Sequence, residues 1–284
     1  MRSLTDIASL SADEINAILN VKLDGRHILR TRGGGSVALM FHEPSTRTRF
    51  SFSQAVHHVG LIPVDLDPSL SSEQKGETTV DTCRNLAWAE ARAIIIRTRT
   101  AGLPAEVAAA VDIPVINAGD GTNEHPSQAF GDALTLMGHF KRIRGLTIAI
   151  VGDVSMSRVA RSNAYLLTKL GANVRLVSAS EPRNMPASLR TDSLETGLLG
   201  ADVVMILRWQ DERHLPGRRA KETYHIDEDI LARLAPKAML MHPGPVNRGI
   251  EVTSDVVDGP RSLVKAQVQN GVKARMKILH HLLD

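Results

Sequence analysis

Short apolar runs alternate with helix-like segments along almost the whole of this 284-residue chain. Strands that alternate with helices are typical of parallel β-sheets with helices on both faces. The runs fall into two sets of four, which predicts an α/β fold of two doubly wound domains, each with a parallel sheet of about four strands flanked by helices. The eight runs are residues 36–41, 62–67, 93–97, 114–117, 147–151, 173–177, 203–207 and 238–241.

The same pattern predicts the domain organisation, because the chain is long enough for two hydrophobic cores. We expect residues 126–140 to form the helix that bridges the two halves. The first domain is predicted to span residues 1–135, and the second residues 136–263. A final helix within residues 264–284 is predicted to pack back on the first domain.

The segment of residues 41–50 indicates an anion-binding site. Its sequence, FHEPSTRTRF, follows an apolar run and precedes a helix-like segment of residues 50–59, so it predicts a strand-to-helix turn. Such a turn directs backbone N–H groups and the positive end of the helix dipole to one point. The added hydroxyl and guanidinium groups suit a phosphate ester or an acyl phosphate. Taken alone, the segment could also be a helix N-cap followed by solvated arginines.

Further motifs begin where other apolar runs end, and ligands of open α/β sheets gather at the carboxyl ends of strands. They are QKGET at residues 74–78, GDGTNEHPSQA at residues 119–129, LRWQ at residues 207–210 and HPGPVNRG at residues 242–249. In this order and at these spacings, together with the turn above, they resemble the aspartate/ornithine carbamoyltransferase family. The resemblance covers about residues 4–282 and is greater to the aspartate branch of the family.

The resemblance implies that the amino group of an acceptor attacks the carbonyl carbon of carbamoyl phosphate, with no cofactor, metal or covalent intermediate. Catalysis would then come from holding two anions in register and from stabilising the oxyanion and the leaving phosphate. The residues implied to be catalytic are Arg47, Thr48, Lys75, Arg97 and His125. Those implied to bind carbamoyl phosphate are Ser45, Thr46, Arg47, Thr48, Ser71, Arg97, His125, Gln128, Pro243 and Gly244.

The acceptor implied by the resemblance is L-aspartate, which would give N-carbamoyl-L-aspartate and phosphate in pyrimidine biosynthesis. Two arginines facing two carboxylates are what a dicarboxylic amino acid requires. The residues implied to bind aspartate are Lys75, Arg158, Arg208, Gln210, Gly244 and Pro245. An ornithine-type enzyme would be expected to carry Cys in place of Gly244.

The resemblance also implies an assembly. In this family, the loop that corresponds to residues 68–76 enters the active site of a neighbouring subunit, so a homotrimer with shared sites is expected. A regulatory chain or a dihydroorotase partner is left open. Residues 213–219 are expected to belong to a loop on the acceptor side.

The bulk properties favour small anionic substrates over nucleic acid or membrane. The formal charge is +3, but the basic residues are scattered and only 3% of residues are aromatic, so no stacking platform or basic stripe is expected. No apolar run has the length of a membrane span and the N-terminus lacks the apolar core of a signal peptide, which favours a cytoplasmic location. The single cysteine, Cys83, is interpreted as a packing residue in a helix of residues 78–88.

Three positions depart from the family pattern: Thr98 stands where relatives often have His, His42 replaces a commoner aromatic residue, and Trp209 is large beside the predicted carboxylate ligands. Two alternatives therefore stay open, a paralogous carbamoyltransferase with another amino-acid acceptor and a non-catalytic homologous subunit. A nucleotide-binding dehydrogenase is disfavoured, because no Gly-x-Gly-x-x-Gly turn follows any of the apolar runs.

Overall fold

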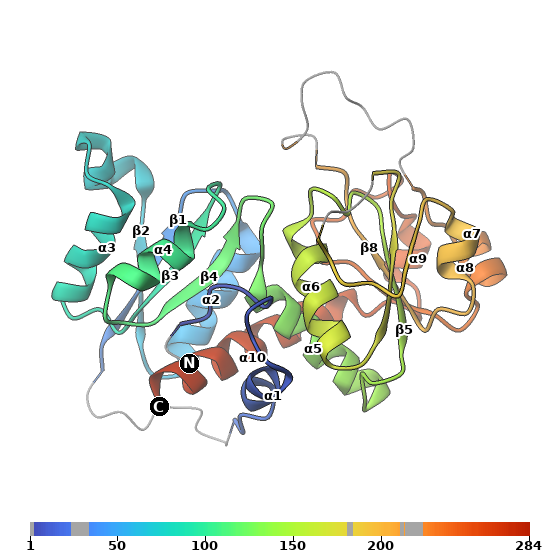
Figure 1. Cartoon of the computed structure of the whole chain (residues 1–284), viewed down its shortest axis with the longest axis horizontal. Coiled ribbons are helices and arrows are strands. Elements are labelled where there is room, and N and C mark those ends of the chain that lie inside the picture. The colour runs from blue at the N-terminus through green and yellow to red at the C-terminus, as the bar shows by residue number, and fades with distance from the viewer. Residues whose placement is uncertain (1–2, 24–33, 181–183, 211–212, 214–223) are drawn as a thin grey trace. The chain divides into compact units, whose positions relative to one another are not determined.

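A computed structural model describes residues 3–23, 34–180, 184–210, 213 and 224–284 of the chain. The chain divides into two compact units. The first comprises Met1–Gly131 together with Asn270–Asp284, and the second comprises Asp132–Gln269. Each unit contains its own parallel β-sheet (Figure 1).

The first unit is built on a four-stranded sheet with the order β2-β1-β3-β4. All three pairings of neighbouring strands are parallel. The strands are β1 (Ser36–Phe41), β2 (Ile62–Leu66), β3 (Ala93–Thr98) and β4 (Val115–Asp120). Strands β1, β3 and β4 are buried along almost their whole length, and their sequences therefore contain the apolar runs from which they were predicted.

Helices cover both faces of this first sheet. Their bounds, with two short 3₁₀ helices, are α1 (Ala12–Leu19), α2 (Thr46–His58), η1 (Pro68–Leu70), η2 (Ser72–Lys75), α3 (Thr79–Trp88) and α4 (Leu103–Ala110). One face packs against α3 and α4, through a core that includes Met40, Cys83 and Val107. In the view of Figure 1, α2 lies behind the sheet, on the opposite face.

The second unit is built on a five-stranded parallel sheet with the order β7-β6-β5-β8-β9. The strands are β5 (Thr147–Val151), β6 (Asn173–Val177), β7 (Leu189–Thr191), β8 (Val203–Ile206) and β9 (Met239–Met241). Four of them correspond to predicted runs. The edge strand β7 was not predicted, because three residues of mixed polarity carry no periodic signal.

Helices also cover the second sheet. They are α6 (Arg158–Lys169), α7 (Leu194–Leu198), α8 (Glu228–Leu234) and α9 (Ser254–Asp258). One core joins the sheet to α7, α8 and α9 through side chains such as Leu198, Leu231 and Val256. Figure 1 shows these three helices on one side of the sheet and α6 on the other.

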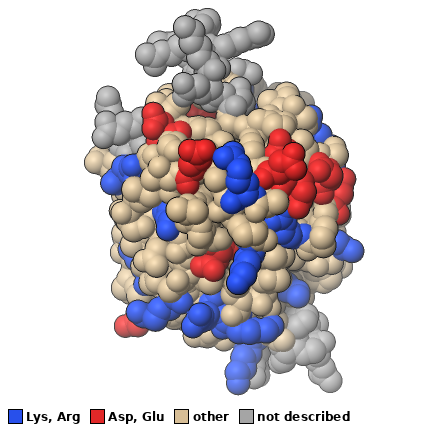
Figure 2. All heavy atoms as spheres, turned by 90° about the vertical axis from the view of Figure 1, so that its right-hand side faces the viewer, with Lys and Arg blue, Asp and Glu red and all other residues tan. Residues whose placement is uncertain are grey.

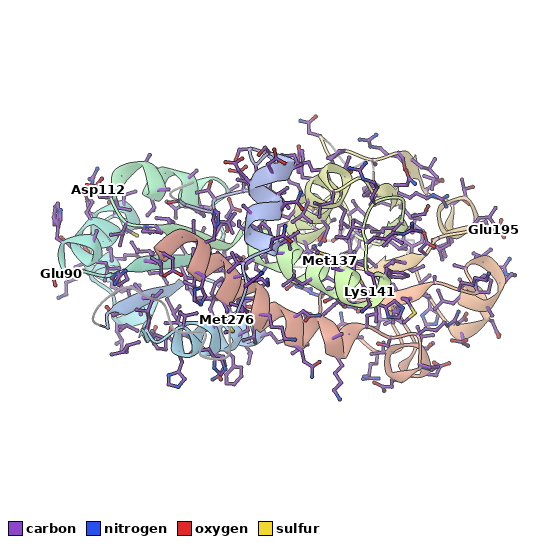
Figure 3. The ribbon with its side chains drawn as sticks, turned by 90° about the horizontal axis from the view of Figure 1, so that it is seen from below. Glu90, Asp112, Met137, Lys141, Glu195 and Met276 are labelled. Carbon is purple, nitrogen blue, oxygen red and sulfur yellow. The ribbon has the colours of Figure 1, made fainter. Side chains whose placement is uncertain are left out.

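Two long helices, α5 (Pro126–Phe140) and α10 (Val264–Leu283), each contribute residues to both units. The C-terminal part of α10 packs within the first unit. The guanidinium of Arg275 lies over the Phe52 ring of α2, 4.8 Å from its centroid, and the Lys277 ammonium donates to the Leu19 carbonyl at 2.8 Å. Met276, which stands between Arg275 and Lys277 in the sequence and is labelled in Figure 3, is buried.

Two helices end in residues with left-handed backbone conformations, which Figure 3 marks. Glu90 follows α3 with φ 64°, and Lys141 follows α5 with φ 63°. The Lys141 ammonium donates to the Gly138 carbonyl at 2.6 Å and so occupies one of the acceptors at that helix end.

The structure corrects one expected boundary. Helix α2 begins at Thr46, not at residue 50, with Ser45 as its N-cap in an extended conformation. The first helical turn is therefore Thr46–Arg49, which lacked the apolar periodicity used to predict the helix. No helix in the described part of the chain combines the length and apolar character needed to cross a bilayer.

Candidate active site

The first turn of α2 places the predicted phosphate ligands at the carboxyl end of β1. Ser45 caps the helix by backbone position only, since its side chain makes no capping hydrogen bond. By contrast, the N-cap side chains of α1, α3, α6 and α8 each accept from a backbone N–H group. The α2 N-terminus therefore has no capping hydrogen bond from its N-cap side chain, and it carries the exposed side chains of Thr46 and Arg47 and the buried Thr48.

Arg97 lies at the same edge of the sheet. It ends the pairing of β3 with β1, where its partner is Phe41, and its carbonyl accepts from the His42 N–H at 2.9 Å. Its guanidinium is half-buried, donates to the Ala118 carbonyl at 3.3 Å and lies 3.4 Å from the Glu43 carboxylate. Arg97 is thus oriented beside the turn that carries Ser45.

His125 is held at the start of α5 by a buried network of acidic side chains. The Asp120 carboxylate accepts from the N–H groups of Gly102 and Glu124 at 2.7 and 3.0 Å. The Glu124 carboxylate accepts in turn from the N–H groups of Ile7 and Ala8 at 2.8 and 3.1 Å. This network anchors the loop between β4 and α5, so His125, which is only 4% exposed, has a defined place at the helix mouth.

Gln128 occupies the first turn of α5, where its N–H donates to the His125 carbonyl at 3.1 Å. The His125 ring also lies near its own helix, with Nδ1 3.4 Å from Ser127 Oγ. Pro126 begins the helix, a position at which its missing N–H costs no hydrogen bond. The predicted motif of residues 125–128 is therefore a helix start that presents a histidine and an amide together.

Ser71 and Lys75 bracket η2. The Ser71 hydroxyl accepts from the Glu73 N–H at 3.2 Å, and Gly76 ends the 3₁₀ helix with φ 97°. The side chain of Lys75 is exposed. The Glu73 side chain reaches His42, at the end of β1, with 2.9 Å between Oε2 and Nε2.

The predicted acceptor-side residues other than Lys75 lie in the second unit, at the carboxyl edge of its sheet. Arg158 opens α6 after β5 and is 3% exposed, while the hydroxyl of Ser157 caps that helix by accepting from the Ala160 N–H at 3.1 Å. Arg208 and Gln210 follow β8, which pairs directly with β5. The two segments are therefore neighbours along the sheet edge.

Asp153 ties these two segments together. Its buried carboxylate accepts from the Gln210 N–H at 3.0 Å. The guanidinium of Arg208 donates to the Trp209 carbonyl at 3.0 Å. The sequence analysis predicted no role for Asp153.

The turn of residues 243–245 follows β9, the neighbour of β8, and is shaped by His242. His242 Nδ1 accepts from the Gly244 N–H at 2.8 Å, so the ring proton lies on Nε2, which donates to the buried Glu251 carboxylate at 3.1 Å. The Glu251 carboxylate also accepts from the Asn247 N–H at 2.6 Å. Gly244 has φ 67°, and its bond to Pro245 is cis.

A second set of buried contacts supports the same turn from behind. Gln267 Oε1 accepts from the His242 N–H at 2.8 Å, and Gln267 Nε2 donates to the Asp132 carboxylate at 2.9 Å. Asp132 accepts on its other oxygen from Asn163 of α6, also at 2.9 Å. Three helices therefore fix the strand end from which Pro243, Gly244 and Pro245 project.

A pocket opens at this sheet edge, above β5, β6 and β8. It is lined by Gly152, Asp153, Ser178, Ala179, Ser180, Leu207, Trp209 and Tyr224. None of these is a predicted aspartate ligand, although Trp209 stands between Arg208 and Gln210. Trp209, one of the three positions that depart from the family pattern, therefore forms part of the pocket lining.

The predicted residues form two groups, one in each unit. Sequence reasoning assigned no role to Glu43, Asp120, Glu124, Asp153, His242 or Glu251, all of which hold predicted ligands in place. Glu43, Asp120, Glu124 and His242 lie inside the predicted motifs, whereas Asp153 and Glu251 lie outside them. Most of the predicted acceptor-side loop of residues 213–219 lies outside the described residues. Within those residues, no group of three His, Cys, Asp or Glu side chains is arranged to hold a metal ion.

Comparisons with known proteins match the two halves of the chain to two domains of one family. Residues 2–138 match the carbamoyl-P binding domain of the aspartate/ornithine carbamoyltransferases, and residues 144–282 match their Asp/Orn binding domain. The aspartate carbamoyltransferase catalytic subunit of Koribacter versatilis is 44% identical over 295 residues, which cover 99% of this chain and 97% of the relative.

Solved structures of an aspartate transcarbamoylase and of an ornithine carbamoyltransferase resemble the fold of this chain. Aspartate transcarbamoylase from Trypanosoma cruzi in complex with carbamoyl phosphate has a TM-score of 0.87 and 27% identity, and the match covers 100% of this chain and 97% of the other. Ornithine carbamoyltransferase from Pyrococcus furiosus has a TM-score of 0.85 and 28% identity, with 99% and 97% covered. The two matched domains span nearly the whole sequence, and the chain therefore belongs to the aspartate/ornithine carbamoyltransferase family.

Proposed function

We propose that the protein transfers the carbamoyl group of carbamoyl phosphate to the amino group of L-aspartate, giving N-carbamoyl-L-aspartate and phosphate. The observation that carries this proposal is the N-terminus of α2, which has no side-chain cap and bears Ser45, Thr46, Arg47 and Thr48 beside Arg97. The aspartate carbamoyltransferase catalytic subunits among its relatives support L-aspartate as the acceptor. This step belongs to pyrimidine biosynthesis.

The phosphate group would bind at the α2 turn. The backbone N–H groups and hydroxyls of residues 45–48 donate to its oxygens, while Arg47 and Arg97 supply the compensating charge. Arg97 is kept in place by Glu43, so little side-chain entropy is lost when the anion binds. Ser71 and Lys75 add a hydroxyl and an ammonium from η2.

His125 would donate to the carbamoyl oxygen as negative charge develops on it. A donor that is already positioned and largely buried stabilises an oxyanion without reorganisation, which makes it more effective than water. Gln128 and the carbonyl groups near Pro243 and Gly244 would accept from the carbamoyl amide. His242 sets the direction of those carbonyls through its hydrogen bond to the Gly244 N–H.

L-aspartate would bind to the second unit. Arg158 pairs with its α-carboxylate, and Arg208 with Gln210 holds the side-chain carboxylate; Lys75, Gly244 and Pro245 complete the set. Because Asp153 holds the Gln210 backbone, the spacing between the two carboxylate-binding segments is fixed by the sheet edge. This spacing would favour a dicarboxylic acid of defined length.

A homotrimer with shared sites is part of the proposal. The edge strand β2 and its surroundings expose large apolar side chains, namely Phe50, Ile62, Val64 and Leu70. An exposed apolar sheet edge is a liability in a monomer and is suited to burial against another chain. On the face of the molecule seen in Figure 2, in contrast, acidic and basic side chains both occur among uncharged ones.

The assignment of substrates to domains follows the predicted boundaries, residues 1–135 with residues 264–284 for carbamoyl phosphate and residues 136–263 for aspartate. We also propose a cytoplasmic location. The only cysteine is a buried free thiol, which is compatible with a reducing compartment. A regulatory chain or a dihydroorotase partner stays an open prediction.

The test is an acceptor panel. Purified protein is incubated with carbamoyl phosphate and, separately, L-aspartate, L-ornithine, L-glutamate or L-asparagine, and the carbamoylated product and phosphate are both quantified. We expect product with L-aspartate alone and competition by succinate, which carries both carboxylates but no amine. Turnover of L-ornithine would contradict L-aspartate as the acceptor. The absence of turnover with any of the four amino acids would favour the non-catalytic alternative.

A further inference from the structure

One side-chain pair of the first unit links the two segments that carry its predicted ligands. His42 directly follows β1, and Glu73 lies in the middle of η2, 31 residues further along. His42 Nε2 and Glu73 Oε2 are 2.9 Å apart, and the two side chains are 19% and 15% exposed. A contact this short between mostly buried polar groups restrains both segments more than a surface pair would.

The remaining polar atom of each side chain forms no hydrogen bond in the described part of the chain. These two atoms, His42 Nδ1 and Glu73 Oε1, are both buried. Neither side chain can therefore exchange its partner for a neighbouring one without moving.

Both residues are joined to ligands through the backbone. The His42 N–H donates to the Arg97 carbonyl at 2.9 Å, and Ser45 follows three residues later. The Glu73 N–H donates to the Ser71 hydroxyl at 3.2 Å, and the Glu73 carbonyl accepts from the Gly76 N–H at 3.1 Å. A restraint on the Glu73 side chain is thus a restraint on the whole turn from Ser71 to Lys75.

We propose that His42 and Glu73 are positioning residues: their contact holds the η2 turn against the end of β1 and so determines where Lys75 and Ser71 present their polar groups. This inference rests on the proposed function, because it concerns the same reaction. It assigns a role to His42, which replaces a commoner aromatic residue of the family. An aromatic ring could pack at this place, but only a donor can hold the Glu73 carboxylate.

The contact is made within one chain. If Lys75 serves the site of a neighbouring subunit, the His42–Glu73 contact lies in one subunit and affects catalysis in the site of the next subunit. Glu73 variants should then behave in subunit mixing like Lys75 variants and unlike variants of the phosphate turn.

The test compares kcat and KM of Glu73→Ala and His42→Phe with those of the unmodified protein. We expect each variant to lower kcat/KM about ten-fold, as for a lost hydrogen bond to a charged group. Glu73→Gln, which keeps an acceptor for His42, should recover most of the loss. Glu106→Ala on α4 and His58→Phe on α2 remove exposed side chains of the same unit and should leave kcat/KM unchanged.

The decisive comparison uses the residual activity of a background in which Lys75 and Ser71 are both replaced by Ala. A residue that acts through these two side chains has nothing left to position once both are gone, so Glu73→Ala should cost no further activity there. A merely structural role would cost the same factor in both backgrounds, and that result would overturn the inference. If the unmodified protein transfers no carbamoyl group at all, it is the proposed function that fails.

A second measurement does not depend on activity. Hydrogen exchange of the backbone amides of residues 71–76 should be faster in Glu73→Ala and in His42→Phe, and unchanged in the two control variants. Unchanged exchange in the η2 turn of folded variants would show that the contact does not restrain it, and this would overturn the inference whatever the kinetics.

Discussion

Gly131 of α5 and Gly271 of α10 lie back to back, so that a Cβ atom on Gly131 would approach the Cα of Gly271 at 3.2 Å. The next turn of α10 closes over the same place, since a Cβ on Gly271 would lie 2.9 Å from the Arg275 guanidinium. That guanidinium donates to the Gly271 carbonyl at 2.8 Å and stacks on Phe52. The absence of side chains at these two glycines therefore allows α5 and α10 to approach each other this closely.

We predict that Gly131→Ala lowers the free energy of unfolding by about 1–3 kcal/mol, because backbone atoms must move to admit the new methyl group. Gly138→Ala is the matched control on the same helix, since nothing lies within 4 Å of its Cβ position. That control should stabilise by about 0.5–1 kcal/mol through helix propensity. Urea unfolding of both variants measures the difference, and equal effects would contradict the close contact.

The Cys83 thiol is predicted to be inert in the folded protein. Burial, with the Glu73 charge as the second cause, raises its pKa from 9.0 to about 12. A thiol reagent at neutral pH should therefore modify Cys83 only after unfolding. Rapid labelling of the native protein would contradict the buried position.

The same pKa shift predicts an alkaline loss of stability. The folded pKa lies above the unfolded one, so the contribution of Cys83 is complete below about pH 9 and disappears as the pH rises to about 12. Cys83→Ala lacks this contribution. The difference in free energy of unfolding between the two proteins should accordingly shrink over that pH range, while groups common to both cancel.

Arg47→Ala is expected to leave the fold intact and to lower turnover by about 10²- to 10³-fold, because the phosphate loses charged hydrogen bonds in a partly dry site. Arg84→Ala is the control, an exposed arginine of the same unit whose partner is Asp81 of its own helix. Circular dichroism establishes folding, and steady-state kinetics measures turnover. Near-normal activity of Arg47→Ala would remove the phosphate assignment.

Arg208→Ala is expected to weaken aspartate binding far more than carbamoyl phosphate binding, since only aspartate carries a second carboxylate. KM values for the two substrates and the inhibition constant of succinate measure this separation. An equal change in both KM values, or failure of succinate to compete with aspartate, would count against the dicarboxylate site.

Subunit mixing tests the shared site. Lys75→Ala and Arg47→Ala chains, each with strongly reduced activity, should regain part of the activity when they are dissociated and reassembled together, because some sites would combine an intact turn with an intact Lys75. Mass measurement in parallel establishes the assembly. Stable monomers, or mixed trimers without recovered activity, would exclude sharing while leaving the transfer chemistry in place.

The sequence by itself determined the features that depend on local periodicity. The bounds of β1, β5, β6 and α5 agree with those predicted, because buried parallel strands are continuous apolar runs and an amphipathic helix repeats every 3.6 residues. It also indicated the sheet edge at which the candidate site residues lie, because motifs that follow parallel strands must meet at one end of the sheet.

Tertiary structure decided the contacts between residues distant in the chain. No local pattern indicates that Glu124 would accept from Ile7 and Ala8, or that Glu73 would reach His42. These partners depend on strand order and helix crossing, which follow from the packing of whole elements and not from the propensity of any segment. The short strand β7 was missed for a related reason, since pairing with β6 defines it more than its own three residues do.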